Sequence, residues 1–184
     1  LNVTQRGTDD VPFFHAVYSG YTTYFCSPEN DRDDPDSFWA AQTREIVWGQ
    51  SLGWYHPLIL DKADKCELLN RLAAFRQAHL DCLAYGTMED GIRFLNAVPE
   101  QKVEWLGRKA FYLWTVKDAP LSPTIRGTLP AVVGIVWKSA KGNLAAFLAN
   151  LSNREQTVRF VFAGTEQRQT LAPRELVRMD GVKR

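Results

Sequence analysis

The chain has 184 residues, of which 45% are hydrophobic and 12% aromatic, so it is long enough and apolar enough to build a folded core. Lysine and arginine number 22 against 21 aspartates and glutamates, which excludes a strongly charged surface of the kind that attracts nucleic acid or an anionic membrane. The longest nearly unbroken apolar run, residues 129–137, is about half of the roughly 20 residues that a membrane helix requires. We expect a soluble protein with no nucleic-acid and no membrane partner.

No metal site or cofactor is predicted. Cys26, Cys66 and Cys82 lack C-x-x-C spacing, and only three histidines could join them as ligands, so we expect buried free thiols. The chain begins at Leu1 without a positively charged leader, and this start is consistent with an upstream sequence having been removed. These features do not assign a cellular compartment, although we favour a secreted or periplasmic location over a cytoplasmic one.

The first part of the chain contains two short apolar runs that we expect to be strands. Residues 11–18 suit a strand buried on both faces. Residues 46–55 form the second run, and they carry Gly49 and Gly53, where backbone can come close to a neighbour or a ligand.

Helices are predicted after each of these runs. Residues 27–36 are acidic and rich in turn formers, which indicates a surface loop, and Asp34 before a proline is a typical N-cap. A short helix is therefore expected over residues 35–45. A longer one is expected over residues 61–85, where leucines recur at helical spacing and Gly86 follows as a stop signal.

The remainder of the chain has the pattern of an antiparallel β domain. Six strand candidates lie at residues 102–106, 109–116, 131–138, 144–150, 156–163 and 175–179. Polar corners at 139–143 and 151–154 fit hairpin turns. We expect Trp105, Trp114 and Trp137 in the core of this domain.

Several strings in the chain resemble the C-terminal part of uncharacterised bacterial glycoside-hydrolase-like proteins. They are PFFHAVYSGY at residues 12–21, WGQ at 48–50 with Gly53 and Trp54, and YG-x-M at 85–88; the later VWK at 136–138 and LANL at 148–151 extend the likeness. The resemblance implies α/β followed by all-β: the last βα units of a (β/α)8 barrel in residues 1–98, joined to a small antiparallel β-sandwich in residues 99–184.

The resemblance also implies a function. The chain would be a C-terminal fragment of a carbohydrate-active hydrolase, with residues 13–18 and 47–52 as late barrel strands whose ends face the active site. The residues expected to bind the carbohydrate ligand are Tyr18, Ser19, Tyr21, Gln50, Trp54 and His56.

The catalytic carboxylates cannot be assigned within the chain. Glycoside hydrolysis generally needs two carboxyl groups flanking the bond. Glu29, Asp31, Asp33 and Asp34 lie in the loop after the first run, but clustered loop acids are more often a solvated face. We expect the catalytic pair on the missing N-terminal barrel portion of the same protein, which would then be a partner, and we expect the isolated chain to be inactive.

Two other functions remain open. The chain could be a free-standing carbohydrate- or protein-binding module that uses Trp54 and Tyr55 as a stacking platform, or a structural α+β domain that mediates assembly. Asn2 and Asn150 each begin an N-glycosylation acceptor pattern, a signal that matches frequently by chance.

Overall fold

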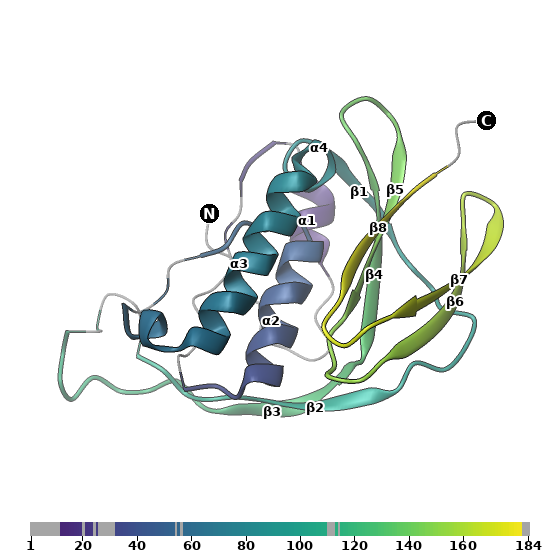
Figure 1. Ribbon diagram of the computed structural model, residues 1–184. Coiled ribbons are helices and arrows are strands. Elements are labelled where there is room, and N and C mark those ends of the chain that lie inside the picture. Colours follow the sequence, from purple (N-terminus) through teal and green to yellow (C-terminus); the bar gives the residue numbers. More distant parts are fainter. Residues whose placement is uncertain are drawn as a thin grey trace.

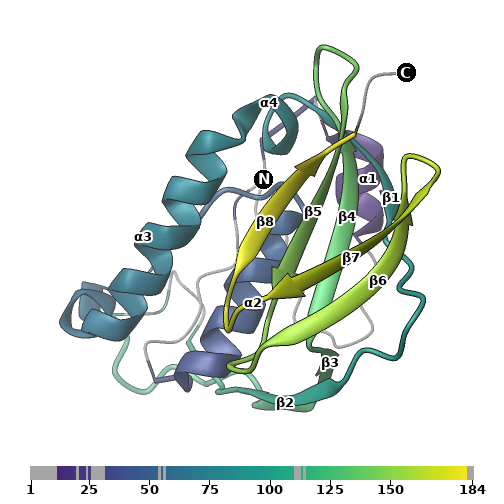
Figure 2. The same ribbon diagram turned by 45° about the vertical axis from the view of Figure 1, so that its right-hand side comes forward.

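The computed structural model describes residues 12–19, 21–23, 25, 32–53, 55, 57–109, 113 and 115–181. Within this part of the chain the elements form three layers, in which helices and a β-hairpin cover opposite faces of a four-stranded sheet (Figures 1 and 2). The helical elements are α1 Phe13–Tyr18, α2 Pro35–Val47, η1 Pro57–Asp61, α3 Ala63–Ala78 and α4 Leu80–Leu83.

The eight strands of the described residues pair in antiparallel fashion. The central sheet has the order β1 Thr87–Gly91, β4 Val132–Lys138, β5 Leu144–Asn150 and β8 Leu176–Asp180. Two further pairs are β2 Glu100–Trp105 with β3 Ile125–Pro130, and β6 Gln156–Phe162 with β7 Thr165–Leu171. In Figure 1 the β2–β3 pair runs below both the helices and the sheet.

The central sheet buries both of its faces. One face, with Trp137 and Phe147, packs against the helices and against β2 and β3. The other face, with Leu148, packs against Val158 and Phe160 of the β6–β7 hairpin. Because side chains alternate along a strand, this double burial explains why β5 is apolar almost throughout.

Helix α2 is buried along almost its whole length, from Ser37 to Val47. Three indole N–H groups fix it in place. Trp39 of α2 donates to the carbonyl of Asn150 at 3.0 Å, and Trp105 of β2 donates to the carbonyl of Ser37 at 2.9 Å. Trp137 of β4 donates to the carbonyl of Val47, also at 3.0 Å.

Both ends of α2 are set by its sequence. The Asp34 side chain accepts hydrogen bonds from the backbone N–H groups of Asp36 and Ser37, as predicted for an N-cap. At the other end, the N–H of Gly49 donates to Ile46 and that of Gln50 donates to Glu45, which is the Schellman arrangement. Gly49 adopts φ +87°, the left-handed conformation that this motif requires.

The prediction of barrel βα units is wrong: the fold is a small mixed α/β arrangement of antiparallel sheets and helices, although a β-sandwich component remains compatible with it. Residues 13–18 form helix α1, and residues 47–52 are the end of α2 and the turn after it. In the described part of the chain, the only parallel pairing is a single bridge between Phe25 and Ser51. The domain boundary at residue 98 stays a prediction; β1 lies before it and pairs with β4 after it.

Most of the other predicted elements are confirmed. The helix from residue 35 is present, and the long helix is present as α3 and α4. Five of the six strand candidates correspond to β2, β4, β5, β6 and β8, whereas the described residues of the candidate at 109–116 lie in no strand. Trp105 and Trp137 are buried, but in the core beside the helices, and Trp114 lies outside the described residues.

Substitution of Gly49 is expected to lower the free energy of unfolding substantially. A Cβ there would lie 2.6 Å from a ring carbon of Trp137, and the positive φ disfavours any side chain. We expect Gly49→Ala to lower the free energy of unfolding by about 1–2 kcal/mol for the backbone and by about 1–3 kcal/mol more for overpacking. Chemical denaturation measures this loss.

Gly142→Ala is the matched control, because Gly142 has φ +81° and nothing within 4 Å of its Cβ position. It should show the backbone cost alone. Equal losses in the two variants would contradict the tight packing of Trp137 against Gly49.

Candidate functional site: a polar cleft beside the start of α2

The four predicted sugar-binding residues that the structure describes do not form one open site. Tyr18 and Tyr21 are exposed on the helical side, with Tyr21 87% exposed, whereas Ser19 and Gln50 are buried. The Ser19 hydroxyl accepts the backbone N–H of Met88 at 3.1 Å, so it holds α1 to β1. Trp54 and His56 lie outside the described residues.

The three strings that carry the family resemblance nevertheless meet in space. Ser19, Trp48, Gly49 and Gly86 line one small cavity together with Trp137. Its volume is about 10 Å³, which is room for about one water molecule and not for a sugar. These residues form a close-packed junction between the helices and the sheet.

Gln50 is the predicted site residue with unused hydrogen-bonding capacity. Its backbone is committed, since its N–H donates to Glu45 and its carbonyl accepts from Arg76 Nε at 2.9 Å. Its side-chain amide is fully buried, and neither the oxygen nor the nitrogen has a hydrogen-bond partner in the described part of the chain. Such a group costs about 1–3 kcal/mol when it is left unpaired.

An apolar groove of about 530 Å³ lies beside η1. Ile59, Leu60 and Leu69 form its walls, and Leu60 is 75% exposed. Tyr55 also lines this groove, and its hydroxyl donates to the side-chain oxygen of Gln42. One residue of the predicted stacking platform therefore lies in a groove, while its neighbour Trp54 is not described.

A second and more polar cleft, with a volume of about 330 Å³, lies where α2 begins. One side is the start of β2, and the other is the loop between β5 and β6. Its hydrogen-bonding side chains, apart from Asp36 and Ser152, are Glu100, Gln101, Lys102, Asn153, Arg154 and Gln156. The sequence did not predict this cleft, because its residues come from four separate segments that only the fold brings together.

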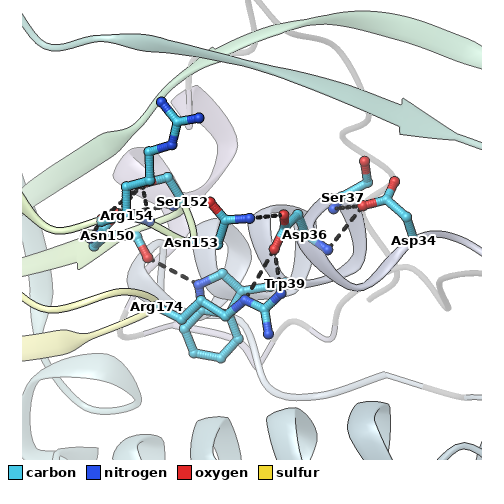
Figure 3. Close-up of polar contacts among 9 residues, drawn as sticks. All are labelled: Asp34, Asp36, Ser37, Trp39, Asn150, Ser152, Asn153, Arg154 and Arg174. Atoms are coloured by element: carbon cyan, nitrogen blue, oxygen red, sulfur yellow. Dashed lines mark hydrogen bonds and ion pairs between the residues drawn. The ribbon is translucent and has the colours of Figure 1, made fainter.

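Asp36 is fixed at one edge of the polar cleft. Figure 3 shows its carboxylate between Asn153 and Arg174. Asn153 Nδ2 donates to Oδ2 at 2.6 Å, and the Arg174 guanidinium donates to Oδ1 through Nε at 3.2 Å and through Nη2. Both carboxylate oxygens are therefore engaged in joining α2 to the loops of the β layers.

Asn150 holds the loop that forms the other side of the polar cleft. Its Nδ2 lies 2.7 Å from the Arg154 carbonyl oxygen, 2.8 Å from that of Ala172 and 3.3 Å from that of Leu171. Its Oδ1 accepts the backbone N–H and the hydroxyl of Ser152 at 3.0 and 2.8 Å. Asn150 is fully buried, so its acceptor pattern for glycosylation is closed in the folded protein, and Asn2 lies outside the described residues.

Several groups in the polar cleft remain uncommitted. In the described part of the chain, no hydrogen bond or ion pair involves the Glu100 carboxylate, the Lys102 ammonium or the Arg154 guanidinium. Among the described residues, Gln101 Nε2 is buried with no hydrogen-bond partner. Gln156 Nε2 donates to the Ser152 hydroxyl, and no hydrogen bond among these residues involves its Oε1. A rigid frame thus presents one anion, two cations and two amides to whatever enters the cleft.

The acids of the loop before α2 have structural roles where they are described. Asp34 is the N-cap of α2, and Asp33 is buried with Oδ1 accepting the backbone N–H of Leu106 at 2.7 Å. Glu29 and Asp31 lie outside the described residues.

Metal and thiol chemistry finds no support in the described part of the chain. No group of three or more histidine, cysteine or acidic residues there could hold a metal ion. Cys66 and Cys82 are free thiols, and burial raises the pKa of Cys82 to about 11, so this thiol is protonated at neutral pH. Cys26 is not described. None of the described helices has the length and apolar character needed to cross a membrane.

Comparison with known proteins gives no match: no family model, curated protein or solved structure matches the chain. The resemblance to glycoside-hydrolase-like proteins therefore stays a prediction.

His15 predicts a pH-dependent stability. It is buried next to the Trp48 ring, with ring centroids 5.9 Å apart, and burial lowers its pKa from 6.5 to about 4. Between these values the unfolded chain binds a proton that the folded chain does not, so this group reduces stability as the pH falls from about 6.5 to 4. Above pH 6.5 it has no such effect.

We expect His15→Gln to remove up to one proton from the slope of unfolding free energy against pH in this window. Denaturation curves at several pH values measure that slope. A slope identical to that of the unsubstituted chain would show that His15 titrates normally in the folded state.

Asn150 is predicted to be essential for the loop. We expect Asn150→Ala to cost about 2–5 kcal/mol, because several carbonyl groups and the Ser152 hydroxyl lose their partner. Asn153→Ala removes a single exposed hydrogen bond to Asp36 and should cost about 1 kcal/mol or less. Thermal unfolding compares the two variants, and similar losses would refute the central role of Asn150.

Proposed function

We propose that this chain is a non-catalytic carbohydrate-binding domain of a glycoside-hydrolase-like protein, and that the polar cleft is where it takes up sugar. The observation that carries the proposal is the cleft itself, in which uncommitted hydrogen-bonding groups face a space of about 330 Å³. The resemblance to carbohydrate-active proteins supports the same class of ligand.

The chemistry of the lining suits a polyhydroxylated ligand. Sugar hydroxyls both donate and accept, so they pair with carboxylate oxygens and with amide groups alike. Glu100 and Gln156 offer acceptors from opposite sides of the cleft, and the Gln101 side chain also lines it.

The backbone around these groups is already ordered, which reduces the entropic cost of binding. The Asn150 side chain fixes the loop that carries Arg154, and the pairing of β2 with β3 fixes Glu100 opposite Pro130. Only side-chain rotamers remain to be ordered by the ligand.

The same geometry argues for binding without cleavage. Glycoside hydrolysis generally uses two carboxyl groups, and the two that line the polar cleft are Asp36 and Glu100. Arg174 and Asn153 engage both oxygens of Asp36, which leaves Glu100 as the one acid available to a ligand. We therefore expect no turnover of aryl glycosides by this chain.

The proposal is tested by titrating the chain with a panel of neutral and acidic oligosaccharides in a calorimeter. We expect at least one sugar to bind saturably. Glu100→Gln keeps the shape of the side chain but removes its charge, so it should weaken that binding about tenfold, the value of one charge-assisted hydrogen bond.

Glu67→Gln is the control for this substitution, since it makes the same change on an exposed position of α3 away from the cleft. It should leave the affinity unchanged. If no sugar in the panel binds, or if both variants behave like the unsubstituted chain, the polar cleft is not a carbohydrate site.

A further inference from the structure

The charges in the polar cleft indicate which kind of sugar it would take. Asp36 is neutralised by Arg174, so this pair offers no net charge to a ligand. The groups that remain are the anionic Glu100 and the cationic Lys102 and Arg154. The uncommitted part of the lining therefore has an excess of positive charge, although the chain as a whole is nearly neutral.

Lys102 has no charged partner across the β2–β3 pair. Along β2, Glu104 pairs with Arg126 of β3, directly across the hairpin. Lys102 instead faces the uncharged Thr128, so no carboxylate on the partner strand neutralises it. This leaves an ammonium group at the cleft without a counter-ion in the described part of the chain.

Arg154 combines a fixed backbone with an uncommitted head group. Its carbonyl accepts from Asn150 Nδ2 at 2.7 Å, and its backbone N–H donates to the Ser152 hydroxyl. In Figure 3 the side chain extends away from the Asp36–Arg174 pair, and its guanidinium makes no contact with the other residues drawn. A guanidinium group presents parallel donors that match the two oxygens of a carboxylate.

We propose that the polar cleft recognises an acidic sugar, a hexuronic acid unit whose carboxylate pairs with Lys102 and Arg154 while its hydroxyls bind Glu100 and the two glutamines. This inference rests on the proposed function and specifies its ligand class. A neutral sugar would leave both cations without a counter-ion. A sulfate ester carries the same charge and can also accept two hydrogen bonds from a guanidinium group, so a sulfated sugar is included in the test.

The test compares uronic acid trimers with their methyl esters, which keep the sugar skeleton and remove the charge. Calorimetric titrations use galacturonate, glucuronate and mannuronate trimers at low and high salt. We expect at least one free acid to bind ten times more tightly than its ester, with an advantage that shrinks in 0.5 M salt. Lys102→Gln and Arg154→Gln should each remove most of this advantage of the free acid over its ester.

Lys141→Gln is the control, because Lys141 lies at the exposed turn at the opposite end of β5 from the cleft loop, and it should change nothing. Equal binding of acid and ester would overturn the acidic-sugar inference and leave carbohydrate binding intact. Binding of a sulfated galactose trimer but of no uronate would also overturn it. If no sugar binds, the inference falls together with the proposed function.

Discussion

The burial of helix α2 is the constraint on which the rest of the structure depends. An apolar helix could be buried by packing alone, but α2 also carries Gln42, Arg44 and Glu45 into the interior. Its position is set by three indole N–H groups, which link α2 to β2, β4 and β5. Because an unpaired indole N–H in this interior would be costly, each of these hydrogen bonds restricts where the helix can lie.

The polar cleft is a consequence of that placement. The carbonyl that Trp39 engages belongs to Asn150, whose side chain holds the loop carrying Arg154. At the start of the same helix, Asp36 is held by Arg174 from the segment before β8. The cleft is therefore framed by contacts to one rigid helix, and its free side chains extend from backbone that the fold has already fixed. The contacts that hold the fold therefore also frame the cleft, and only the side chains that face the ligand are additional.

The sequence predicted the start of α2 and five of the eight described strands, because those signals are local. Asp34 before proline marks the start of α2, and the apolar run of β5 marks a buried strand. The prediction of elements from sequence failed where a short apolar run fits both the periodicity of a helix and that of a strand. In α1, His15 and Ser19 are buried while the residues between them are exposed, which is a helical pattern too short to recognise. Gly49 suggested close backbone approach, and it does contact Trp137, but it also ends a helix.

Polar elements and the site escaped prediction for related reasons. Strand β7 is almost entirely polar, and the turn before it uses Ala163 and Gly164, both at positive φ, in place of the usual asparagine–glycine signal. The polar cleft joins residues from α2, β2 and the β5–β6 loop, and no spacing along the chain indicates that they meet. Asn150 matched a glycosylation pattern, yet its side-chain amide forms hydrogen bonds that hold the loop between β5 and β6. Only the long-range pairing of elements reveals that role.

The most direct test of the central claim is hydrogen exchange at the indole N–H groups of Trp39, Trp105 and Trp137, followed by NMR in D₂O. The account predicts that all three exchange at the slow rate set by global unfolding, because each is buried and hydrogen-bonded to a backbone carbonyl. Fast exchange at any of them, in a chain that is otherwise folded, would show that α2 is not held as described and would remove the frame on which the cleft depends.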